Sequence, residues 1–268
     1  MAREALEGSL ASSRELGDAR CAGAALNDLG VVVRDQGDLI GASARFEQSA
    51  HLWRDLGDGA ALARTLSNLA GLARDQGDYA RARSLHDESQ ALLRAQGDRT
   101  GMAWSLNRQA DVARRQGDRR GARALYEAGL LAFRELGDQW GVASSLDDLG
   151  SLARAESNLQ GAKALYQEGL RTLQCLGFQR GMARLLEGLA CCAIDEGRPA
   201  RALKTAGTAA ALRHALGTPL PPAEAAELER TLETARRALP GAESGRAWME
   251  GWLLSPDEAI DYASGPGD

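Results

Sequence analysis

The sequence predicts an all-α fold, an α-solenoid of antiparallel helix pairs, and two observations predict it. A glycine recurs every twenty residues over most of the chain, and Asp or Asn follows it at most of these positions. Between these marks lie segments of about seventeen residues rich in Ala, Leu, Arg, Glu and Gln, which favour helix. A fixed period of this kind is the signature of stacked repeats that bury their faces on one another. The recurring glycines stand at positions 17, 37, 57, 77, 97, 117, 137, 177, 197 and 217, and Ser157 takes the missing place.

Each Gly-Asp pair supplies both halves of a turn between two helices. The glycine can adopt the left-handed conformation that closes one helix. The Asp or Asn side chain can then accept hydrogen bonds from the free N–H groups that open the next helix. Because the connection is so short, neighbouring helices must run antiparallel. We therefore expect one helix in each interval between the marks.

Alternate helices carry different faces, so the structural period is forty residues. The first type shows apolar and small residues at i, i+3, i+4 and i+7, which form one narrow helix face. Gly or Ala at positions 30, 70, 110, 150 and 190 of that face indicates a close approach of two helix axes. The second type begins with an alanine column at 42, 82, 122, 162 and 202. An aromatic or similar column follows at Phe46, His86, Tyr126 and Tyr166, and Ala206 replaces it in the last repeat.

The order Leu29-Gly30, Gly37-Asp38, Ala42 and Phe46 resembles the tetratricopeptide repeat (TPR). The resemblance covers about residues 1–218 and implies a right-handed superhelix made of a half repeat and five forty-residue repeats. The period exceeds the family's usual thirty-four, as in the longer variants of bacterial regulators and kinesin-light-chain-like scaffolds. HEAT-type repeats share the period but would not explain a Gly-Asp turn at both junctions.

The two ends of the chain depart from the repeat. Residues 1–18 match a second-type helix without its first-type partner, which indicates further repeats or another domain upstream; a lone helix acting as a cap is the alternative. Residues 219–264 are expected to form a C-terminal cap of helices, and 265–268 a disordered tail. The cap resembles the ending of STAND-class NTPase regulators, some of which carry a LuxR-type DNA-binding domain after it. The residues that carry this resemblance are Trp248, Met249, Glu250, Gly251, Asp257, Glu258 and Ala259.

The composition and the absence of known motifs exclude several classes of function. The net charge is −5 with both signs interleaved, which argues against a nucleic-acid surface. No apolar run is long enough to span a membrane and no signal peptide is present, so a cytoplasmic location is expected, and the four cysteines have no metal-type spacing. No glycine precedes a lysine, which excludes a phosphate-binding NTPase loop, and no hydrolase or metal motif occurs. We therefore expect no enzyme, no metal and no cofactor. Arg in thirty of the thirty-two basic positions indicates a GC-rich bacterial genome.

The tetratricopeptide resemblance implies that the first helix of each pair lines a concave groove. Asn side chains there can pair with a peptide backbone, Arg can fork onto a carboxylate, and Trp104 offers a flat anchor. Two alternatives stay open: the arginines at 34, 74, 114 and 154 suit the helix dipole without a partner, and Trp104 could pack on the preceding repeat. The candidate partner-binding residues are Asn27, Asp28, Arg34, Arg64, Asn68, Arg74, Trp104, Asn107, Arg108, Asp111, Arg114, Asp147, Asp148 and Arg154.

The sequence thus predicts a non-enzymatic protein–protein interaction module that binds a peptide or protein segment in its groove, within a larger bacterial signalling protein. The alternative is the ligand-sensing region of a STAND-type NTPase or transcriptional regulator. Its partners would be an upstream NTPase domain of the same parent chain and a small-molecule inducer. A homo-oligomer formed through the exposed first helix is a further alternative.

Overall fold

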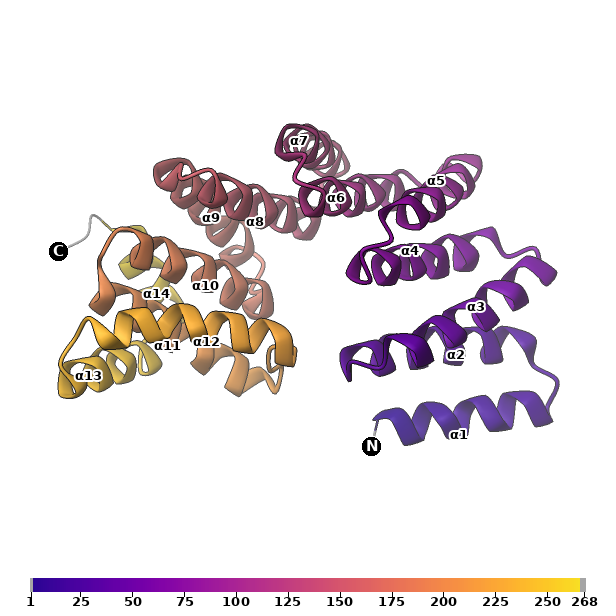
Figure 1. The fold of residues 1–268 in the computed structure, drawn as a ribbon, viewed down its shortest axis with the longest axis horizontal. Coiled ribbons are helices and arrows are strands. Elements are labelled where there is room, and N and C mark those ends of the chain that lie inside the picture. Colours follow the sequence, from indigo (N-terminus) through magenta and orange to yellow (C-terminus); the bar gives the residue numbers. More distant parts are fainter. Residues whose placement is uncertain (1, 266–268) are drawn as a thin grey trace. The chain divides into compact units, whose positions relative to one another are not determined.

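The computed structural model describes residues 2–265, and within them the chain forms fourteen α-helices and no strand (Figure 1). The all-α solenoid class predicted from the sequence is confirmed, since consecutive helices pack as pairs. The chain divides into two compact units, residues 1–132 (unit 1) and residues 133–268 (unit 2). The helices are α1 (Ala2–Glu15), α2 (Ala19–Asp35), α3 (Leu39–Asp55), α4 (Gly59–Asp75), α5 (Tyr79–Ala95), α6 (Arg99–Arg115), α7 (Arg119–Leu136), α8 (Gln139–Ala155), α9 (Leu159–Gln174), α10 (Gln179–Asp195), α11 (Pro199–Leu216), α12 (Pro222–Arg237), α13 (Gly241–Trp252) and α14 (Pro256–Ser264).

The turns follow the rule read from the sequence. Every recurring glycine has a positive φ, for example 89° at Gly37, and Ser157 takes the same left-handed conformation with φ 62°. The following side chain accepts from the N–H three residues on, as from Asp38 to Gly41 (2.8 Å). At α10 and α11 no side chain caps the helix, although α11 begins with a proline at its first turn.

In unit 1, α2 pairs with α3 and α4 with α5, and α1 packs on α2 (Figure 1). Phe46 and Trp53 are buried between the helices, and Phe46 explains the small residue opposite it. A Cβ on Gly30 would lie 2.5 Å from the Phe46 ring, so only glycine fits there. The Ser49 hydroxyl donates to the Gly23 carbonyl at 2.8 Å, which adds a buried bond between α3 and α2.

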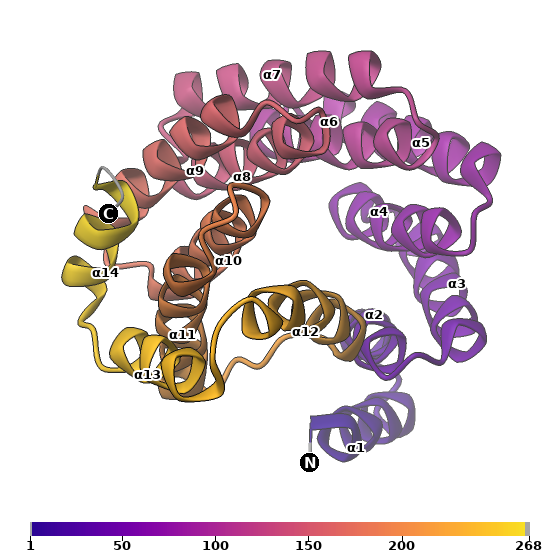
Figure 2. The ribbon, with the colours of Figure 1, turned by 60° about the vertical axis from the view of Figure 1, so that its left-hand side comes forward.

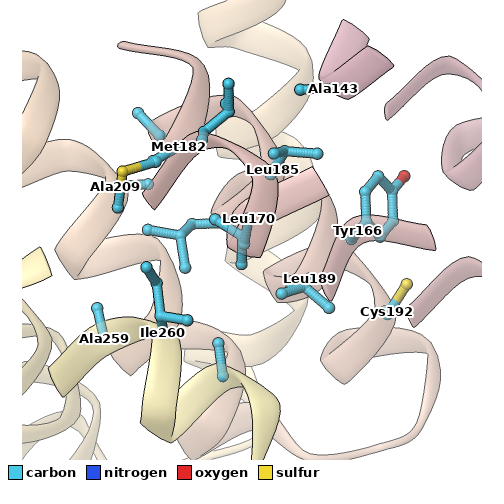
Figure 3. Packing of buried hydrophobic residues seen from close by; sticks show 14 of the residues in the cluster. Ala143, Tyr166, Leu170, Met182, Leu185, Leu189, Cys192, Ala209, Ala259 and Ile260 are labelled. Carbon is cyan, nitrogen blue, oxygen red and sulfur yellow. The ribbon is translucent and has the colours of Figure 1, made fainter. Parts of the chain in front are cut away.

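In unit 2, α8 pairs with α9 and α10 with α11 around a larger core (Figure 3). Tyr166 and Leu170 of α9 lie beside Leu185 and Leu189 of α10 in this core. Gly150 packs against the Tyr166 ring in the same way as Gly30 packs against Phe46. A Cβ on Gly150 would lie 2.7 Å from the Tyr166 ring. The column rule for small and aromatic residues therefore holds in both units.

The three C-terminal helices, α12, α13 and α14, pack against the earlier helices of unit 2 (Figure 2). Helix α13 crosses α11 so closely that a Cβ on Gly251 would collide with the Lys204 carbonyl. Helix α14 places Ile260 in the main core. Arg201 of α11 holds the end of α14, because its guanidinium donates to the carbonyls of Tyr262 (2.8 Å) and Gly265 (2.8 Å). Residues 266–268 of the expected tail lie outside the described residues.

Candidate partner-binding face

The first-type helices of unit 1, α2, α4 and α6, are neighbours and carry most of the predicted groove residues. We call the surface they form the α2–α4–α6 face. It consists of Asn27, Asp28, Arg34, Arg64, Asn68, Arg74, Trp104, Asn107, Arg108, Asp111 and Arg114.

Asparagine side chains form the floor of this face. Asn27 is only 3% exposed, and its side-chain oxygen accepts from Asn68 Nδ2 at 2.9 Å. The Asn27 amide nitrogen donates to Asp28 at 3.2 Å. Asn107 is equally buried, at 4% exposure. The Asn27–Asn68 bond ties α2 to α4, so Asn68 has a structural role that the sequence did not reveal.

The arginines at the helix ends pair with acidic neighbours. Arg34 contacts Asp35 at 3.1 Å, and Arg74 contacts Asp75 at 2.8 Å. Arg74 also bridges to Asp111 of α6 at 3.0 Å, where the Tyr126 hydroxyl donates to the same carboxylate at 2.5 Å. Asp111 therefore joins α4, α6 and α7.

Arg108 differs from these arginines. It is exposed, and within residues 2–265 no carboxylate pairs with it. Desolvation and the like charges of Arg34 and Arg74 lower the pKa of Arg108, whereas the charge of Asp111 raises it. Arg64 is also exposed and has no ion-pair partner in the described part of the chain.

His86 lies buried near this arginine cluster, in the aromatic column of α5. Its side chain is 1% exposed, and burial together with the charges of Arg108 and Arg74 lowers its pKa to about 4. The imidazole is therefore neutral at physiological pH and behaves as a core ring. The sequence predicted the core position, but not its coupling to the arginines.

The predicted residues of unit 2 are engaged in ion pairs between α8 and α10. Asp147 is buried, and burial raises its pKa although Arg184 pairs with it. Arg184 also contacts Asp148 at 3.4 Å. Arg154 contacts Asp195 at 2.5 Å. Sequence reasoning missed Arg184 and Asp195 as partners, although Arg184 occupies the same repeat column as Arg64 and Trp104.

No group of three or more His, Cys, Asp or Glu residues in the described part of the chain could hold a metal ion. The four cysteines are free, and burial raises the pKa of Cys192 to about 12, so its thiol is held protonated. Among the described helices, none combines the length and the apolar character that crossing a bilayer requires.

Comparison with known proteins supports the similarity to a known repeat. Residues 61–130 and 101–174 match the family model of the tetratricopeptide repeat. No curated protein matches the sequence.

Several solved structures share the fold. BtubC (BKLC) from P. vanneervenii is 20% identical with a TM-score of 0.62, and the match covers 82% of this chain and 92% of that one. A Rap protein complexed with Competence and Sporulation Factor is 13% identical with a TM-score of 0.57, covering 88% and 74%. The STAND protein PH0952 from Pyrococcus horikoshii, which has a tetratricopeptide repeat sensor, is 14% identical with a TM-score of 0.58, covering 91% and 38%. At these identities the similarity shows the fold alone.

Proposed function

We propose that the chain is a non-enzymatic interaction module whose α2–α4–α6 face binds an extended, acidic peptide or protein segment. The match to the tetratricopeptide repeat supports an interaction role, and a structural neighbour with this fold, a Rap protein, is complexed with Competence and Sporulation Factor. No catalytic constellation was found in the sequence, and only a repeat domain is detected.

One observation carries the proposal: Arg108 is exposed, has no carboxylate partner within residues 2–265, and lies close to Arg34 and Arg74. The like charges of Arg34 and Arg74 act on the Arg108 guanidinium, although Arg34 pairs with Asp35 and Arg74 pairs with Asp75 and Asp111. A carboxylate from a partner would relieve this repulsion and could accept two parallel hydrogen bonds from Arg108. Such charge-assisted bonds contribute about 1.5 to 3 kcal/mol each.

The other residues of the α2–α4–α6 face either contact the partner or hold the helices in place. Arg64 supplies a second cation without an ion pair, on α4, and Trp104 is half-buried on α6. Asn27 and Asn68 are bonded to each other, so they hold the helices in place for the partner instead of binding it. The partner is therefore expected to contact mainly the arginines, with an affinity that falls as salt rises.

Fluorescence anisotropy with labelled short peptides tests the proposal. One pool carries Asp and Glu at alternate positions, and a matched pool carries Asn and Gln at the same positions. The acidic pool should bind, the amide pool should not, and Arg108→Ala should weaken binding by about tenfold. The control is Arg83→Ala, which removes an exposed arginine of α5 that likewise has no ion-pair partner in the described part. Equal binding of both pools, or unchanged binding by the Arg108 variant, would refute the assignment.

A second candidate is the sensor region of a STAND-type regulator, with an NTPase domain in the same parent chain and a cytoplasmic location. The similarity in fold to the tetratricopeptide repeat sensor of the STAND protein favours it. If it holds, the full-length gene product hydrolyses ATP or GTP, and Arg108→Ala changes the response to the partner but not the basal rate. A gene product that contains no NTPase domain contradicts this candidate.

A further inference from the structure

The last repeat breaks the column pattern at two positions of α11. Ala206 stands where the other repeats carry Phe, His or Tyr, whereas Ala210 stands in a column that holds Leu130 and Leu170 but also Ala50. Arg213 replaces the Trp, Leu or Phe that the other repeats place in their cores. Removing a large aromatic side chain from a packed interface leaves space unless other atoms fill it.

These three residues line one cavity of about 450 Å³ in unit 2. Helices α10 and α11 supply one side of it. Leu228 of α12 and Trp248 of α13 contribute apolar walls, as does the Pro219-Leu220 linker. Figure 2 shows α11, α12 and α13 grouped at this end of unit 2. Cavities of this size and apolar character are typical of small-molecule sites.

A nearly buried ion pair gives the cavity a polar wall. Arg213 donates to both carboxylate oxygens of Glu187, at 2.5 Å and 2.9 Å, and the two side chains are 14% and 12% exposed. The remaining arm of Arg213 donates to the Thr218 carbonyl at 3.3 Å. The pair fixes the geometry of the wall, and its charges cancel.

The other acidic residue of the lining is also neutralised, because Glu229 pairs with Arg236. A charged ligand would therefore find no unpaired carboxylate or guanidinium in the lining, where His214 is the other titratable side chain, and it would lose its hydration on entry. A neutral ligand loses little, and the hydrogen-bonding capacity left on the Glu187 oxygens can receive one polar group.

We propose that this cavity is a binding site for a neutral, mainly apolar small molecule with one hydrogen-bond donor directed at the Glu187–Arg213 pair. The site lies wholly in unit 2 and uses none of the residues of the α2–α4–α6 face. It therefore stands whether or not that face binds an acidic segment.

Two dyes with the same ring system test the proposal on the full chain. N-phenyl-1-naphthylamine is neutral and carries one N–H donor, whereas 8-anilinonaphthalene-1-sulfonate adds a sulfonate charge. The neutral dye should bind with enhanced fluorescence, and the charged dye about tenfold more weakly or worse. Absence of binding by the neutral dye, or tighter binding of the sulfonate, overturns the proposal.

A cavity-filling variant locates the site. Ala210→Leu introduces the residue that two other repeats carry in this column, and it should weaken binding of the neutral dye by about tenfold without lowering the melting temperature. The matched control is Ala22→Leu, which fills the cavity of about 390 Å³ in unit 1 with the residue found at Leu62. The Ala22→Leu variant should bind the neutral dye with the affinity of the wild type.

Loss of binding in the Ala22 variant with retention in the Ala210 variant would place the dye elsewhere and overturn the assignment. If Ala210→Leu does not fold, as judged by circular dichroism, Leu228→Trp fills the cavity from the opposite wall. Binding of the neutral dye by that variant with wild-type affinity would also contradict the site.

Discussion

Unit 1 and unit 2 stack the same helix pairs but use their polar residues differently. Residues 1–132 contain 18 basic and 18 acidic side chains, so the whole net charge of −5 belongs to residues 133–268, with 14 basic and 19 acidic. In unit 2, Arg184 closes on Asp147 and Asp148 of the preceding first-type helix. In unit 1, Arg64 stands in the same column without an ion pair among the described residues. The same repeat column thus holds an ion-paired arginine in unit 2 and, within the described residues, an arginine without an ion pair in unit 1.

The units also differ in how their helices are covered. In unit 2 the C-terminal helices add α13 against α11 and α14 against α9 and α11. In unit 1 the second-type helices α3 and α5 have no such added helices within residues 1–132. The added packing of C-terminal helices is therefore a feature of unit 2.

The largest expected effect comes from breaking the α11–α13 crossing of unit 2. Gly251→Ala should destabilise the protein by about 3 kcal/mol, because the new methyl group meets the Lys204 carbonyl and backbone, which cannot move aside. Urea unfolding measures the change. Gly245→Ala in the same helix is the control, since no atom lies within 4 Å of its added Cβ, and it should stabilise slightly. Equal effects of the two substitutions would contradict the tight crossing.

The next effect concerns His86, whose counterpart in unit 2 is Tyr166. Since the folded protein lowers the His86 pKa from 6.5 to about 4, the unfolded chain binds more protons between these values. The stability that neutral His86 contributes is thus complete above about pH 6.5 and is lost as pH falls towards 4.

Urea unfolding of the wild type and of His86→Phe at about pH 7 and about pH 4.5 measures this contribution. The wild type should lose about 2 kcal/mol more than the variant on acidification. A parallel loss in both proteins would show that His86 is not responsible.

A pair of arginine substitutions sharpens the contrast between the faces. Arg184→Ala leaves the buried Asp147 carboxylate without its cation and should cost about 1 to 2 kcal/mol, a value reduced by the 61% exposure of Arg184. Arg64→Ala, in the same column of unit 1, should change stability by less than about 0.5 kcal/mol. Thermal unfolding of both variants tests this, and similar losses would remove the distinction between the units.

The smallest effect is expected at the floor of the unit 1 face. Asn68→Ala removes the hydrogen bond to the buried Asn27 oxygen and should cost about 1 kcal/mol or less, since the Thr65 hydroxyl, at 3.4 Å, also approaches that oxygen. The unfolding midpoint in urea measures the loss. Unchanged stability would return Asn68 to the set of residues free to bind a partner.

Local rules made most of the fold predictable from the sequence. Left-handed glycine closes a helix, an Asp oxygen opens the next, and a large ring requires a small residue opposite, as at Phe46 and Gly30. These requirements act within a few residues or within one helix pair. Hence the turns and the aromatic column could be read directly.

The pairing of polar residues could not be read in the same way. Arg184 pairs with Asp147, thirty-seven residues earlier in the sequence, and Arg74 pairs with Asp111, thirty-seven residues later. Such contacts depend on how one pair stacks on the next, which a helix-face pattern does not specify. The change at Ala206 was visible in the sequence, but its combination with Arg213 into one cavity required the packing of α12 and α13.

Photo-crosslinking from matched positions of the two units shows which of them contacts the partner. A photoreactive p-benzoylphenylalanine replaces Trp104 on α6 or, in a second protein, Ser144 on α8, which occupies the same repeat column. With the labelled acidic peptide pool, we expect an adduct from position 104 that Arg108→Ala suppresses, and little adduct from position 144. An adduct formed mainly at position 144, or equally at both, would contradict the claim that the arginine-rich face of unit 1 holds the partner.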